Sequence, residues 1–170
     1  MIGSLRTLGV LNAAIWFGSA ASMVLFASPS LHSAAMLTLL GPKHYPYFSD
    51  AITQILLTRW FHWQIVFGVI ALIHFFGERL YFGQTAIKFP PGLLMALLGI
   101  MLLDGTLIQS RCQRYLPAQI AVNLSAEAKA RSTASFHAWD TAGAFAHVLL
   151  AVGLGLYVLR LSQSFDRRAA

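Results

Sequence analysis

The chain has 170 residues, of which 57% are hydrophobic and only 11% carry a charged side chain. Soluble domains contain about 25% charged residues, so the composition excludes an ordinary soluble protein and favours a membrane protein. The net charge of +6 comes from Lys and Arg dispersed between apolar runs, which argues against a nucleic-acid partner and for anionic phospholipids. The single cysteine, Cys112, excludes an intramolecular disulfide and a cysteine zinc site.

Four stretches are long and apolar enough to cross a hydrocarbon core about 30 Å thick, which needs about 20 helical residues. They cover residues 8–27, 60–82, 91–108 and 138–159. A cleaved secretory signal is the alternative for the first stretch, but that stretch exceeds the roughly 7 to 15 apolar residues of a signal core. We therefore predict an all-α fold, in which residues 1–170 form a single membrane domain, a four-helix transmembrane bundle.

Small residues predict how these helices pack. Ala14, Gly18 and Ser22 are spaced four apart in the first span, as in the close helix contacts of membrane proteins. We expect the bundle to pack through these residues and through glycines of the last span, Gly143, Gly153 and Gly155.

Two long connections separate the spans. Residues 28–58 contain the short apolar run 34–40 and then a Gly-Pro pair, which predicts an interfacial helix followed by a turn. Residues 111–137 contain an Ala-rich stretch with charged residues, which predicts an exposed helix. Four spans place both long connections on one side, and both termini with the short link 83–90 on the other.

The orientation does not follow from the count of Lys and Arg, because six lie on each side. The basic C-terminus favours termini in the cytoplasm. We expect a multi-pass protein of the bacterial inner membrane, with the lipid bilayer and other membrane subunits or further copies of the chain as partners.

Ionisable side chains inside the spans are the site candidates, since each costs about 2.5 to 3.5 kcal/mol at the bilayer centre. Six of them lie toward the side of the long connections, and their spacing places Asp104 with Arg111, and His137 with Asp140, on shared helix faces. The six residues are Arg59, His62, Asp104, Arg111, His137 and Asp140.

Three interpretations of this polar cluster stay open. Arg59 or Arg111 can neutralise Asp104 or Asp140 in an ion-pair lattice that only fixes the packing. The cluster can line a functional cavity or a proton or ion path. The side chains can also extend to the headgroups without a further role.

A second polar layer lies toward the opposite side and consists of Asn12, His74 and Glu78. Because His74 and Glu78 are four residues apart, they can bond along their own helix. The layer is then either a self-satisfied group near the interface or a proton relay.

Haem b between two histidines is the alternative cofactor hypothesis, although no cofactor is predicted. Two stacked haems are unlike this pattern, because His62 and His74 differ by about 120° around their helix and His137 and His147 by about 80°. A single haem held by His74 and His147 remains, against an interpretation in which His147 packs in the core with a polar partner across the bundle.

Several segments resemble the bacterial domain of unknown function 4149, a family of small four-helix membrane proteins similar to eukaryotic transmembrane protein 205. The resemblance rests on residues 11–18, the Phe-Ala-Ser-Pro of residues 26–29, Arg59, Pro117, and the Phe-His-Ala-Trp-Asp of residues 136–140. Where relatives have Phe-x-x-Leu-His-x-x-Ser, this chain has Trp139 and Asp140 after His137, so a serine is missing. The resemblance implies four spans and a membrane location, and no established reaction.

The motifs of common enzymes are missing: the sequence has no His-Glu-x-x-His pair, no Gly-rich phosphate loop and no Gly-x-Ser-x-Gly elbow. We therefore expect a non-enzymatic function, in transport or as an accessory subunit of a larger membrane complex. The alternative is a membrane-bound electron carrier or oxidoreductase subunit with b-type haem.

Overall fold

The structure, a computed structural model, describes residues 2–82 and 91–166, and these form helices joined by short turns. No strand occurs within these ranges. Four helical runs are long and apolar enough to cross a membrane, Thr7–Leu31, Tyr45–Leu80, Pro91–Gln119 and Ala126–Gln163. The predicted all-α fold with four such helices is confirmed.

The first run contains a π-helical turn. It consists of α1 (Ile2–Ser22), the π-helical η1 (Met23–Ala27) and α2 (Ser28–Leu31). Pro29 lies just after the π turn, where it lacks the N–H that an α-helix would bond to the carbonyl four residues earlier. The wider turn of η1, in which the Ser28 N–H bonds to the carbonyl of Met23, brings the chain to this proline without breaking the helix.

A short helix and a tight turn lead into the second run. The side chain of Ser33 caps α3 (Ala34–Leu40) by accepting from the N–H of Met36. Gly41 ends α3 with φ of 72°, a conformation that glycine adopts without strain. The long helix α4 then covers Tyr45–Phe82, so it begins well before the span expected from residue 60.

The third run also changes its helical type midway. It comprises α5 (Pro91–Leu103), the π-helical η3 (Asp104–Ile108), α6 (Gln109–Tyr115) and the 3₁₀ turn η4 (Pro117–Gln119). After a turn, α7 covers Ala126–Asp166. The exposed helix expected between the last two spans is therefore the first part of α7 itself.

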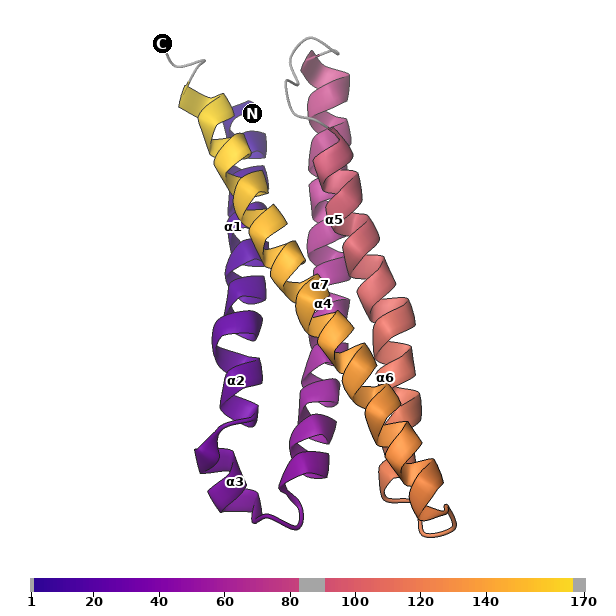
Figure 1. The fold of residues 1–170 in the computed structure, drawn as a ribbon. Coiled ribbons are helices and arrows are strands. Elements are labelled where there is room, and N and C mark those ends of the chain that lie inside the picture. Colours follow the sequence, from indigo (N-terminus) through magenta and orange to yellow (C-terminus); the bar gives the residue numbers. More distant parts are fainter. Residues whose placement is uncertain (1, 83–90, 167–170) are drawn as a thin grey trace.

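The helices form an elongated bundle that α7 crosses diagonally (Figure 1). α7 packs against α1, α5 and α6, and α1 also packs against α4. The α3–α4 and α6–α7 connections lie at one end of the bundle, and the start of α1 lies with the end of α7 at the other (Figure 1). We call the first of these the connection end.

The apolar core lies between α1, α4, α5 and α7, and Trp16, Leu94, Leu97 and Leu154 are at most 1% exposed within it. Gly153 belongs to this contact, because a Cβ there would lie 2.6 Å from Leu97 Cδ2.

The packing predicted for the first span is wrong. Ala14, Gly18 and Ser22 are exposed, and no atom lies within 4 Å of a Cβ built on Gly18. α1 instead packs through Ala13, Trp16 and Ala20, a face on which small alanines leave room beside the buried indole ring of Trp16.

Large apolar side chains cover the outside of the bundle away from the connection end. α7 exposes residues such as Phe145, Val152 and Leu159, and α5 exposes Met95 and Leu102. A soluble protein rarely exposes such an extended apolar surface. The surface suits lipid tails, and we call it the apolar belt.

Candidate functional site

Asp104 is the most deeply buried charged residue in the described chain, at 2% exposed. It opens the π turn η3, where Leu103 and Leu107 are exposed while Asp104 and Ile108 face inward. Burying a polar group without a partner costs about 2 kcal/mol or more. The partners of this carboxyl group therefore decide what the site can do.

One carboxylate oxygen of Asp104 is well partnered. His147 Nε2, on α7, lies 2.9 Å from Asp104 Oδ2, and the two side chains are 11% and 3% exposed. Gln109 Nε2 lies 3.4 Å from the same oxygen and 3.4 Å from the carbonyl of Leu57 on α4. Trp60 packs its ring edge-on against His147, with 5.2 Å between centroids. The Asp104–His147 pair, together with Gln109 and Trp60, thus connects α4, η3, α6 and α7.

The other oxygen of Asp104 is buried and accepts no hydrogen bond from a described residue. Gln54 Oε1, on α4, is in the same condition, although Gln54 is only 5% exposed. A Cβ built on Gly143 would lie 3.7 Å from Asp104 Oδ1, so glycine leaves the space beside this oxygen open. Two buried acceptor oxygens therefore have no hydrogen-bond donor among the described residues.

Asp104 and Gln54 line one cavity of about 110 Å³ between η1, α2, α4, η3, α6 and α7. The two π turns contribute to its walls, Met23 and Val24 from η1, and Asp104 and Ile108 from η3. π-helical turns are rare and occur often at functional sites. The volume is enough for a few water molecules or a small cation.

The cavity walls are acidic. Asp140 lines the cavity together with Asp104, and it lies seven residues before His147, on nearly the same face of α7. Among the described lining residues there is no Lys or Arg. Two carboxyl groups, one imidazole and unpaired acceptor oxygens favour a species that carries positive charge or donates hydrogen bonds.

The structure does not bring the six residues of the predicted polar cluster together. Asp104 and Asp140 line the cavity, whereas Arg59 and His62 line an adjoining open groove of about 460 Å³ that shares Gln54 with the cavity. Arg111 lies over the Trp139 ring, 5.9 Å from its centroid, and His137 is exposed.

The predicted ion-pair lattice is absent from the described residues, where Asp104 pairs with His147 and neither Arg59 nor Arg111 pairs with an acid. Arg59 is exposed and Arg111 is half-buried, so both guanidinium groups lie nearer the surface than Asp104 does.

The second polar layer lies near the other end of α4. Asn12 Nδ2 donates to the carbonyl of Phe67, 3.0 Å away. His74 is 6% exposed and packs closely against Gly9 of α1. Glu78 is half-buried. These contacts tie α1 to α4 without forming a cavity with the Asp104 site.

The arrangement does not fit a single haem on His74 and His147. The iron-binding Nε2 of His147 is bonded to Asp104, and His74 packs against Gly9. The cavity beside His147 is small compared with the roughly 300 to 1,000 Å³ of cofactor sites. The other interpretation of His147 agrees with the structure, since Asp104 is its polar partner across the bundle. No group of three metal-ligating side chains occurs in the described residues.

A second aspartate–histidine pair closes the connection end. His32 Nε2, just after α2, lies 3.0 Å from Asp50 Oδ1 on α4, and His32 Nδ1 lies 3.0 Å from the carbonyl of Ser28. The Ser49 hydroxyl donates to the carbonyl of Leu31 beside it. Burial lowers the pKa of His32, but the bonds to Ser28 and Asp50 outweigh it, so the pKa is raised above 6.5.

Sequence reasoning missed several of these residues. Gln54 and Gln109 interrupt apolar runs. A search limited to ionisable residues misses such uncharged polar side chains. His32 and Asp50 lie in a segment taken as a connection. The π turns that line the cavity have no sequence signature comparable to a helix cap.

No protein-family model, curated protein or solved structure matches this chain. The resemblance to the domain of unknown function 4149 family therefore stays a prediction, and the site's chemistry carries the functional argument.

Proposed function

We propose that this chain is a multi-pass integral membrane protein that moves protons or small monovalent cations through the Asp104 cavity. The observation that carries the proposal is the buried carboxyl group of Asp104. One of its oxygens is bonded to His147, and the other faces an acidic cavity without a donor. Intramembrane carboxyl and imidazole groups in such contact are typical of proton and ion paths.

The chemistry of the pair suits proton exchange. A proton shared between Asp104 Oδ2 and His147 Nε2 can reside on either atom, so the pair is either two neutral groups or an ion pair. Both forms keep the hydrogen bond of 2.9 Å. A cation that enters beside Asp104 Oδ1 favours the ionised carboxylate and repels a positive charge on His147, so the pair gives up its proton to water as the cation binds.

The membrane placement is supported by the four long apolar helices and by the apolar belt. It is tested by washing membranes from expressing cells with alkaline carbonate. An integral protein stays with the sedimented membranes, and recovery of the chain in the soluble fraction would refute the placement.

Transport is tested in liposomes that contain the purified protein and a pH-sensitive dye. A potassium diffusion potential, negative inside, drives cations inward, with sodium as the probe cation in parallel samples. We expect the wild-type protein to change the internal pH faster than protein-free liposomes do. Asp104→Asn should reduce the rate to that of protein-free liposomes, because the amide cannot exchange a proton.

Asp50→Asn is the matched control, since it makes the same change in the aspartate–histidine pair outside the cavity. Equal losses in both variants would contradict a specific role of Asp104. A wild-type rate equal to that of empty liposomes in every sample would refute proton movement and proton-coupled cation movement through the cavity, and an accessory role in a larger membrane assembly would then be the alternative.

A further inference from the structure

The open groove between α4 and α6 is distinct from the cavity in its chemistry. It has a volume of about 460 Å³, and its lining includes Arg59, His62, Thr58 and Gln113. No acidic residue lines it among the described residues. Arg59 is exposed and pairs with no acid in the described part of the chain. The groove therefore offers an uncompensated positive charge.

Hydrogen bonds across the groove fix its polar side chains. Gln113 Nε2, on α6, donates to Thr58 Oγ1 on α4 at 2.9 Å, and Thr58 Oγ1 donates to the carbonyl of Gln54 at 2.8 Å. His62 Nδ1 lies 2.7 Å from the carbonyl of Thr58, so Nδ1 carries the proton that is donated. The floor of the groove is thus held in place before any ligand binds, which lowers the entropy cost of binding.

The groove also has an apolar side. Ile55 and Leu116 line it, and Ile55 is 65% exposed. Toward the other end of the bundle the surface of α4 continues with exposed Trp63, Val66 and Val69. The groove therefore lies where the exposed arginines of the connection end meet the apolar surface of α4, which suits a ligand with an anionic head and an apolar tail.

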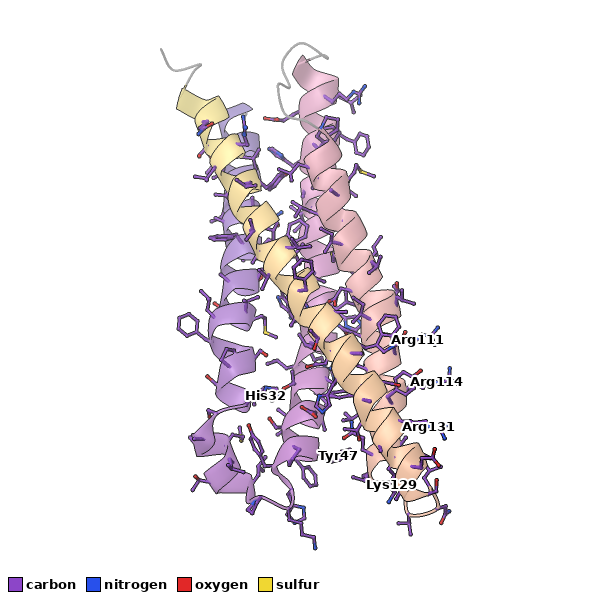
Figure 2. The ribbon with its side chains drawn as sticks, in the orientation of Figure 1. His32, Tyr47, Arg111, Arg114, Lys129 and Arg131 are labelled. Atoms are coloured by element: carbon purple, nitrogen blue, oxygen red, sulfur yellow. The ribbon has the colours of Figure 1, made fainter. Side chains whose placement is uncertain are left out.

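Other cations strengthen the positive charge of the connection end. Figure 2 shows Arg111, Arg114 and Arg131 along the outer side of the α6–α7 hairpin. Arg131 is paired with Glu127, whereas Arg111 and Arg114 pair with no acid in the described residues. A field of this sign attracts anionic lipids.

We infer that the α4–α6 groove binds the phosphodiester headgroup of an anionic phospholipid taken from the bilayer. Arg59 pairs with the phosphate, His62 supports it when protonated, and Ile55 and Leu116 contact the glycerol and the start of an acyl chain. A free phosphate would leave the apolar side of the groove uncovered, which favours a lipid. The inference rests on the proposed membrane placement and does not depend on transport through the cavity.

The test is native mass spectrometry of the full-length protein, purified in detergent and mixed with equal amounts of phosphatidylglycerol and phosphatidylcholine. We expect the wild-type protein to retain phosphatidylglycerol in preference. Arg59→Gln should lower the retained phosphatidylglycerol about fivefold, the loss expected for one interfacial arginine. Gln113→Glu should lower it as well, because it places a negative charge beside the phosphate.

Arg160→Gln is the matched control, since Arg160 is exposed on the last turns of α7, away from the groove. This variant should retain phosphatidylglycerol like the wild-type protein. Equal retention of both lipids by the wild-type protein would overturn the inference. So would an equal loss in Arg59→Gln and Arg160→Gln, which indicates attraction by net charge alone, or displacement of the lipid by inorganic phosphate.

The two proposals fail separately. If Arg59→Gln loses the lipid while the liposome assay shows no transport, the groove stands without the proposed cation path. If transport depends on Asp104 and lipid retention does not depend on Arg59, the cation path stands without the proposed lipid site.

Discussion

Two aspartate–histidine pairs in this molecule have nearly the same geometry and different surroundings. Asp104 and His147 lie 2.9 Å apart with side chains 3% and 11% exposed, and Asp50 and His32 lie 3.0 Å apart with 11% and 40%. The first pair adjoins a cavity with unpaired acceptor oxygens. The second connects the turn after α2 to α4. The hydrogen bond alone does not distinguish a functional site from a purely structural contact. Burial of the pair and the groups around it make that distinction.

The largest difference between the two pairs is expected when each aspartate is replaced by alanine. Asp104→Ala should lower the free energy of unfolding by about 3 kcal/mol, because it leaves His147 buried without its partner and removes one of the two acceptors of Gln109. Asp50→Ala should cost about 1 kcal/mol or less, since water can replace the carboxylate beside half-exposed His32. The measurement is denaturant unfolding in detergent micelles. Equal losses would mean that burial does not separate the pairs.

A methyl group added next to the buried pair should have an intermediate effect. In Gly143→Ala the new Cβ would lie 3.3 Å from Ile108 Cγ2 and 3.7 Å from Asp104 Oδ1. We expect this crowding to cancel the gain that alanine brings to a helix, so that Gly143→Ala is about 1 kcal/mol less favourable than the same change at Gly99, together with slower cation movement in liposomes. Gly99→Ala is the control, because no atom lies within 4 Å of its Cβ.

That control should gain up to about 1 kcal/mol, since alanine favours a helix over glycine. The difference in stability between the two alanine variants measures the crowding beside Asp104. A Gly143→Ala protein that is as stable as Gly99→Ala and transports normally would show that the space beside Asp104 is not constrained.

The smallest effect concerns pH at the half-exposed pair. Because the pKa of His32 is raised in the fold, the pair contributes its full stability below a pH of about 6.5 and loses it as the pH rises through the raised pKa. We expect the Tm to fall by about 1 to 2 °C over this range.

His32→Gln should remove that part of the pH dependence and leave the rest of the curve unchanged. The check is a set of thermal unfolding curves in detergent at closely spaced pH values. A Tm that rises with pH in the wild-type protein and not in the variant would contradict the assigned direction.

Much of the fold was predictable from composition and hydrophobic runs. A run such as residues 91–108 has no polar face, so a helix in lipid is the arrangement that satisfies its backbone. The short helix at Ala34–Leu40 and the turn at Gly41 also follow from local signals. The start of α4 at Tyr45 did not follow from local signals. No helix-breaking residue separates its first turns from the apolar residues of the expected span.

Composition and the hydrophobic pattern were enough to establish the helical class, the four apolar runs and the ionisable residues within those runs. That Asp104 meets His147 and neither arginine, and that η1 and η3 both line one cavity, became clear from the packed helices. Helical spacing fixes which residues share a face of one helix. Which faces meet depends on the packing of large side chains such as Trp16, and on π turns that rotate every later residue.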